Sequence, residues 1–202
     1  MIRRSRMAFV IAVAAVIAAA GCQPQQPEQQ AEQPTAPPER LPVQTRVAVA
    51  PIGPASGSAL SGLTVFTESD GTVTLELTLE NASPGTHGVH IHEIGDCSAT
   101  DASSAGGHWN PTGEEHGKWG EPPFHLGDIG NVEVGEDGTG SLTMSTDLWS
   151  VGDGSDRDVV GKSVVVHSGA DDFTTQPAGD SGERIGCGVI QLQEEMAPAL
   201  VD

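Results

Sequence analysis

Positively charged residues are scarce in this 202-residue sequence, which contains nine Lys and Arg against 28 Asp and Glu. Lys118 and Lys162 are its two lysines. Binding to nucleic acid requires a concentrated cationic surface, so this charge balance excludes DNA and RNA as partners. Tyr is absent and only four Phe occur, whereas Gly is abundant and Val, Thr and Leu recur in short runs. Such a composition is typical of a turn-rich, all-β chain.

Long apolar runs are also scarce, and the notable one lies at residues 7–20. It follows three arginines within the first six residues, so residues 1–21 are predicted to be a signal peptide. A permanent transmembrane helix needs roughly 20 apolar residues, which this run does not reach. The small residues before Cys22 resemble a bacterial lipobox, in which the cysteine is lipidated and two acyl chains anchor the protein stably. Ala19 stands where Leu is usual, so cleavage by an ordinary signal peptidase remains an alternative.

The chain is expected to divide into four parts, of which the signal peptide is the first. A Gln-, Pro- and Glu-rich linker occupies residues 22–42, one β-domain spans residues 43–195, and residues 196–202 form a tail. The predicted location is the cell envelope, with the membrane as a partner through a lipid on Cys22. Gln23 differs from the acidic residue that retains lipoproteins at the inner membrane. This favours the periplasmic side of the outer membrane, or the cell surface in a Gram-positive cell.

The body of the chain reads as short β-strands joined by tight turns. Asp70-Gly71 is a two-residue hairpin signal, and residues 135–140 predict a second hairpin turn. No segment shows the sustained apolar period of a long helix, so an antiparallel sandwich or barrel is expected. Two long stretches poor in apolar residues, 95–126 and 168–184, are predicted to be functional loops. The predicted strands are 43–52, 63–68, 72–80, 131–134, 141–145, 163–167 and 188–193.

Six of the seven histidines fall in a pattern that suits metal binding. His90 and His92 lie two apart in a strand, so both imidazoles point to one face, although such a pair also fits two partly exposed histidines. His167 ends another strand and can complete an all-imidazole set with them, which suits copper better than a hard cation. The donors of a tetrahedral zinc site are offered by His108, His116, His125 and Asp128. One shared imidazole would let these seven residues serve two four-coordinate ions.

Six segments of the sequence resemble the copper,zinc superoxide dismutases, in particular their secreted bacterial branch. These segments are GVHIHEIGDC (88–97), GGHWNP (106–111), EEHG (114–117), FHLGDIGNV (124–132), VVHSGADD (165–172) and GERIGCGVI (182–190). The similarity spans residues 43 to about 193, and every metal position of the family is occupied in order. It implies an eight-stranded antiparallel Greek-key barrel or sandwich with two long functional loops, holding copper and zinc as cofactors.

Roles for individual residues also follow from the resemblance. The implied copper ligands are His90, His92, His108 and His167. The implied zinc ligands are His108, His116, His125 and Asp128, with His108 as the bridging imidazolate. Asp171 matches a carboxylate that links one imidazole of each metal and fixes their tautomers. His87 matches a structural position, where a hydrogen bond to the backbone is expected.

The resemblance implies an enzyme, a superoxide dismutase that converts superoxide to oxygen and hydrogen peroxide at copper and protects the cell envelope. Arg184 and His108 are its catalytic candidates, because Arg184 would orient the anionic substrate and His108 would supply a proton. A disulfide between Cys97 and Cys187 would tie the metal loop to the strand that presents Arg184, and an exported protein permits this bond.

Alternatives remain open at this stage. A non-catalytic envelope lipoprotein that binds copper and zinc would use the same ligands, but it would have no need of Arg184. Residues 168–183 contain no lysine, so electrostatic steering of superoxide is expected to be weak. A homodimer is common in the family, but the sequence does not choose an oligomeric state.

Overall fold

The computed structural model describes residues 44–193 of the chain. The predicted signal peptide and the whole predicted linker, Cys22 included, lie outside these residues, as does the predicted tail. Within residues 44–193 no helix is long and apolar enough to cross a membrane. One 3-10 turn, η1, occurs at Ser103–Ala105. The strands are β1 (Arg46–Pro54), β2 (Ser61–Ser69), β3 (Thr72–Glu80), β4 (Gly85–His92), β5 (Asp128–Val134), β6 (Gly140–Thr146), β7 (Ser163–His167), β8 (Arg184–Val189) and β9 (Gln191–Leu192).

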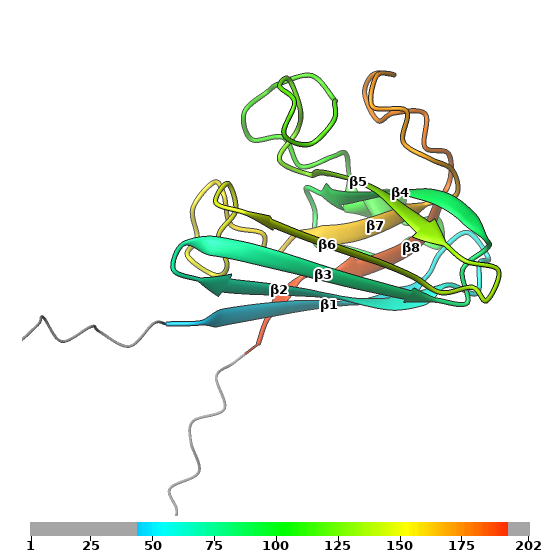
Figure 1. Ribbon diagram of the computed structural model, residues 1–202, viewed down its shortest axis with the longest axis horizontal. Helices are drawn as coiled ribbons and strands as arrows, with labels where there is room; N and C mark the ends of the chain where they lie inside the picture. Colours follow the sequence, from blue (N-terminus) through cyan, green and yellow to red (C-terminus); the bar gives the residue numbers. More distant parts are fainter. Residues whose placement is uncertain (1–43, 194–202) are drawn as a thin grey trace, which may run out of the picture. The chain divides into compact units, whose positions relative to one another are not determined.

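Eight antiparallel strands close into a barrel (Figure 1). Their order is β2-β3-β6-β5-β4-β7-β8-β1, and β1 pairs back with β2 along most of its length. The short β9 continues past β8 and pairs with β1. Two of the connections between successive strands, β3 to β4 and β6 to β7, join strands that are not neighbours in the sheet, which gives the Greek-key arrangement. The predicted fold class is therefore confirmed, as a closed barrel.

Alternation of side chains along the strands builds the core. In β3 the buried residues Val73, Leu75, Leu77 and Leu79 alternate with outward-facing polar residues. In β7 all five residues are buried, because loops cover the outer face of this part of the barrel. Figure 1 shows the two long loops, around residues 95–126 and 168–183, rising from the side of the barrel formed by β4, β5 and β7.

Strand boundaries differ from the sequence prediction for five of the seven predicted strands, and β4 had no predicted range of its own. The predicted first strand, 43–52, begins at Arg46 and runs on to Pro54. The predicted last strand, 188–193, is wrong at its start, because β8 begins at Arg184 and a separate β9 follows it. Two glycines in β8 lower its β propensity, but pairing with β7 extends the strand to the partners His167 and Arg184. Arg184 therefore stands on the barrel, at the end of the second loop.

The turn between β2 and β3 confirms the first predicted hairpin. Asp70 and Gly71 both have positive φ, at 51° and 76°. This geometry twists the connection in the same sense as the flanking strands, which explains the unbroken register from Ser61↔Glu80 to Ser69↔Thr72.

Candidate metal centre

The histidines of β4 point away from the core. Val89 and Ile91 belong to the hydrophobic core, so the alternate residues His90 and His92 face outward, under the long loops. Both are almost completely buried, at 0% and 1% exposure. The pairing of β4 with β5 shifts register between Val89 and His90. Such an irregularity re-aims the side chains beside it, here toward the covered outer face.

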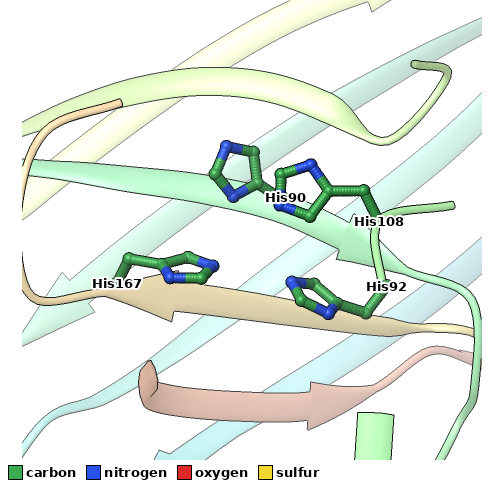
Figure 2. A group of neighbouring side chains, drawn as sticks. All are labelled: His90, His92, His108 and His167. Carbon is green, nitrogen blue, oxygen red and sulfur yellow. The ribbon is translucent and has the colours of Figure 1, made fainter. Parts of the chain in front are cut away.

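Four histidines meet on this outer face and form what we call the all-histidine group: His90, His92, His108 and His167. Each histidine offers one ring nitrogen as a possible ligand, and these four nitrogens all lie within 4.8 Å of one another. Figure 2 shows their imidazoles gathered over β4 and β7, with His108 arriving from the loop. His92 and His108 also form an isolated antiparallel bridge, which fixes the loop against the end of β4.

A second cluster, the histidine–aspartate group, contains His108, His116, His125 and Asp128. The Nδ1 atoms of its three histidines lie 2.9, 3.1 and 3.2 Å from Oδ1 of Asp128. Donors bound tetrahedrally at zinc distances are about 3.3 Å apart, so these spacings match the edges of a zinc site. The other carboxylate oxygen, Oδ2, accepts backbone N–H groups from Gly117 and His125 at 3.0 and 2.8 Å, which fixes the carboxylate.

His108 belongs to both groups through its two different ring nitrogens. Nδ1 faces Asp128 at 2.9 Å, whereas Nε2 is buried without a hydrogen-bond partner. An imidazole placed in this way can contribute one donor atom to each of two ions.

Unpartnered ring nitrogens test whether these groups fit metal ions. Buried polar atoms normally have a hydrogen-bond partner, so an unpartnered one needs an explanation. In the described part of the chain, seven buried side-chain atoms lack a partner, and Thr64 Oγ1 is the one outside the two groups. The other six are His90 Nδ1, His92 Nε2, His108 Nε2, His116 Nδ1, His125 Nδ1 and His167 Nε2. Their lone pairs fit copper and zinc as ligands, since both ions accept imidazole nitrogen.

Asp171 connects the two groups. Its Oδ2 accepts a hydrogen bond from His90 Nε2 at 2.8 Å, and its Oδ1 accepts one from His116 Nε2 at 2.9 Å. Asp171 thus holds a proton on Nε2 of each histidine, so that Nδ1 is the nitrogen directed to the metal group. His92 and His167 donate from Nδ1 instead, to the carbonyls of Gly106 and Gly182 at 3.0 and 3.3 Å, which frees their Nε2 atoms.

The guanidinium of Arg184 lies beside the all-histidine group. Nη1 donates to the carbonyl of Ala102, and Nη2 donates to the carbonyl of Gly106, each at 2.7 Å. A disulfide joins Cys97 to Cys187, with a Cα–Cα distance of 5.8 Å. This bond ties the loop that offers both carbonyls to β8, the strand that begins with Arg184.

Burial dominates the electrostatics of the all-histidine group. It lowers the pKa of His92 to about 2, of His167 to about 3 and of His108 to about 4. The positive charge of Arg184 adds to the lowering of the pKa at His92 and His167. These imidazoles are therefore neutral at physiological pH, which is the state that binds metal ions.

Carboxylates reverse this effect in the histidine–aspartate group. Burial alone would lower the pKa of His116, but the neighbouring carboxylates of Asp128 and Asp171 outweigh it and raise this pKa to about 9. Burial alone would raise the pKa of Asp128, but the hydrogen bond from His108 and the close Nδ1 atoms of His116 and His125 hold it well below its ordinary value. The carboxylate of Asp128 is thus ionised, as a zinc ligand must be.

The free energy of unfolding of the metal-free protein should fall as the pH drops below about 6.5. In the unfolded chain, histidines bind protons near their ordinary pKa of 6.5. In the folded protein, His108, His167 and His92 resist protonation until the pH approaches about 4, 3 and 2. The unfolded state therefore binds more protons in this interval, and stability is lost on acidification. Urea unfolding of the metal-free chain between pH 7 and pH 4.5 measures the effect.

His116 contributes in the opposite direction at higher pH. Because its folded pKa is raised to about 9, its stabilising contribution is complete below pH 6.5 and is lost as the pH rises toward 9. A urea midpoint that stayed constant or increased from pH 6.5 to pH 4.5 would contradict the acid-side prediction.

Several residues that support the site were not anticipated from the sequence. Asn131 clamps the backbone of Asp171, since its Nδ2 donates to the carbonyl at 2.9 Å and its Oδ1 accepts the N–H at 2.8 Å. Gln176 makes the same kind of amide pair with the backbone of His116, with both distances 2.9 Å. Gly179 has a φ of 66°, and a Cβ there would lie 1.8 Å from Asp171 Oδ1. Only glycine fits beside the Asp171–His116 contact.

The seventh histidine, His87, lies outside both groups. Its Nδ1 and Nε2 are each 2.8 Å from a backbone carbonyl oxygen, those of His167 and Ser83. The hydrogen bonding expected for His87 is present in the structure.

Comparisons with known proteins agree with this geometry. A family model described as copper/zinc superoxide dismutase matches residues 60–190. Among solved structures, a double mutant of a SOD-like protein from Bacillus subtilis is 36% identical, covering 71% of this chain and 96% of its own, with a TM-score of 0.64. The clock protein EA4 is 31% identical, covering 73% of this chain and 94% of its own, with a TM-score of 0.65.

The family match includes both metal groups, Arg184 and Cys187, and the first of these relatives exceeds 30% identity over nearly its whole length. Barrel topology, ligand chemistry and sequence similarity therefore agree, and the chain belongs to the copper/zinc superoxide dismutase family.

Proposed function

We propose that this protein is a superoxide dismutase, which converts two superoxide anions and two protons into one O₂ and one H₂O₂. In this reaction one anion is oxidised and the other is reduced. The main support is the sharing of His108 between two groups whose unpartnered nitrogens fit copper and zinc. Copper held by the all-histidine group supplies the one-electron redox chemistry, and zinc supplies positive charge without redox activity.

Arg184 has the chemistry to bind and orient the substrate. Superoxide is a small anion, and the guanidinium is a permanent cation beside the all-histidine group. The two carbonyls of Ala102 and Gly106 hold it in place, so little conformational freedom remains to be lost when an anion binds. The loop 168–183 contributes acidic residues and no lysine, so Arg184 has to attract the anion without help from that loop.

His108 is the proposed proton carrier. Its Nε2 faces the other histidines of the all-histidine group, and its Nδ1 is held by Asp128 at 2.9 Å. A proton held on Nε2 is therefore directed toward the place where the anion would be reduced. Asp171 keeps His90 and His116 in their tautomers, so the donor set keeps one arrangement during turnover.

The decisive experiment measures superoxide consumption by the full chain, loaded with copper and zinc, in wild type and in Arg184→Ala. The variant should keep both metals and lose about tenfold or more in rate, because the cation that attracts the anion is gone. Arg157→Ala is the matched control. It removes the same charge from an exposed arginine that bonds to the carbonyl of Asp147, so its rate should equal that of wild type.

Two results of this experiment would each reject a part of the proposal. If wild type binds both metals yet removes superoxide no faster than buffer, dismutase activity is rejected, and the chain is the alternative, a non-catalytic copper- and zinc-binding protein of the envelope. If Arg184→Ala and Arg157→Ala lose activity equally, the role of Arg184 is rejected, because net charge and not its position controls the rate.

The proposed location is the cell envelope, with a lipid anchor on Cys22. Support comes from the arginines, apolar run and small residues that precede this cysteine in the sequence. Cell fractionation tests the proposal, since wild type should sediment with membranes and Cys22→Ser should be recovered in the soluble fraction. Recovery of both forms in the soluble fraction would show that an ordinary signal peptidase releases the domain.

A further inference from the structure

The peptide bond between Gly106 and Gly107 has partners at both ends. Its carbonyl, on Gly106, accepts hydrogen bonds from His92 Nδ1 at 3.0 Å and from Arg184 Nη2 at 2.7 Å. Its N–H, on Gly107, donates to Oε1 of Glu93 at 3.2 Å. One peptide therefore touches a candidate metal ligand, the candidate substrate-binding cation and a carboxylate for which the mechanism above has no role.

The side chain of Glu93 lies close against this turn. The backbone N–H of Glu93 donates to the carbonyl of Gly107 at 3.0 Å, so the two segments are paired in both directions. Gly106 has a φ of 76°, and a Cβ at this position would lie 2.8 Å from Oε1 of Glu93. The turn therefore requires glycine both for its backbone conformation and for contact with the carboxylate.

A peptide unit is planar, so fixing its N–H also fixes the direction of its carbonyl. A hydrogen bond from an N–H to a carboxylate is charge-assisted and stronger than one to a neutral acceptor. A carboxylate at the N–H end also polarises the peptide and makes the carbonyl oxygen a better acceptor. Glu93 can therefore act on His92 and Arg184 together, without touching either through its side chain.

We propose that Glu93 is a positioning residue, which holds the Gly106–Gly107 peptide so that its carbonyl aims Arg184 at the substrate anion and fixes the proton of His92 on Nδ1. This inference rests on the proposed function, because it gives Arg184 a substrate to orient. The inference adds an exposed residue, Glu93, at the outer end of the hydrogen bonds that run through the Gly106–Gly107 peptide to His92 and Arg184.

Three substitutions separate the reach of the side chain from its charge. Glu93→Gln keeps a carbonyl oxygen at the same reach and loses the charge. Glu93→Asp keeps the charge and is one methylene too short to reach Gly107, and Glu93→Ala loses both. Glu76→Ala, at an exposed position of β3, controls for the change in net charge. Copper and zinc contents are counted for every variant.

The first readout is the affinity of azide, a small monovalent anion, measured from the absorption spectrum of the copper(II)-loaded protein without turnover. Loss of one hydrogen bond should weaken azide binding about 2- to 10-fold in Glu93→Ala and Glu93→Asp. Glu93→Gln keeps a hydrogen bond without its charge assistance, so its azide affinity should lie between those of wild type and Glu93→Ala, and Glu76→Ala should match wild type.

The second readout is amide hydrogen exchange at Gly107 in the zinc-loaded, copper-free protein. Exchange should become about fivefold faster or more in Glu93→Ala and Glu93→Asp, and the rate in Glu93→Gln should lie between theirs and that of wild type. Unchanged exchange or unchanged azide affinity in Glu93→Ala overturns the inference, as does an equal loss of affinity in the Gln and Ala variants. If loaded wild type binds no azide, the proposed function fails, and exchange at Gly107 alone decides the role of Glu93.

Discussion

Replacing His108 by alanine should weaken the binding of both metals at once and lower superoxide removal by about 100-fold or more. The shared imidazole offers one nitrogen to each group, so its loss leaves three protein donors in each. It also removes the proposed proton carrier, and proton transfer by a positioned side chain typically contributes 10²- to 10⁴-fold. Metal content after dialysis against a chelator, together with the rate of superoxide consumption, measures the effect.

Two matched variants separate the groups. His125 belongs only to the histidine–aspartate group, so His125→Ala should weaken zinc binding and spare copper binding. His92 belongs only to the all-histidine group, so His92→Ala should do the reverse. If His108→Ala changed the affinity of one metal and left the other as in wild type, the assignment of a shared ligand would be wrong.

Removing the disulfide should produce the largest loss of stability. The bond between Cys97 and Cys187 closes a span of 90 residues. In the chain-entropy model, closing a span of this length stabilises the folded state by about 4 to 5 kcal/mol. The variant with both Cys97→Ser and Cys187→Ser should therefore unfold at a much lower urea concentration than wild type. Comparing the metal-free forms keeps metal binding out of the measurement.

The double variant Cys97→Ser with Cys187→Ser should also remove superoxide more slowly than wild type under conditions in which it is still folded. The loop beginning at Cys97 contains Ala102 and Gly106, whose carbonyls hold the guanidinium of Arg184. Cys22→Ser is the control, because it removes a cysteine and leaves the Cys97–Cys187 bond intact. A double variant with the urea midpoint and activity of this control would show that the disulfide contributes to neither.

Local chemistry made most of the fold predictable. The alternation in β3 and the Asp70-Gly71 turn depend on neighbouring residues alone, so the sequence identified both. The start of β8 could not be identified in this way. Its two glycines have low β propensity, and pairing with the distant β7 forms the strand at this point.

In the candidate site, too, residues in local patterns could be predicted, whereas residues that act on distant parts of the chain could not. The spacing of His90 and His92 is a local pattern, and the resemblance to a family supplied the partners that are distant in sequence. Gln176 and Asn131 were missed because each acts on backbone 40 to 60 residues away, through an amide that has no local pattern. Glu93 was missed because its partner is a backbone N–H, which every residue except proline offers.

Asp171 makes the two metal-binding equilibria interdependent. One carboxylate contacts both His90 and His116, so an ion that orders either histidine also reduces the freedom of the other. Thermodynamic reciprocity then requires that the factor by which zinc raises the affinity for copper equal the factor by which copper raises the affinity for zinc. The protein should therefore fill cooperatively, so that at limiting metal supply fully loaded and empty molecules outnumber those holding a single ion.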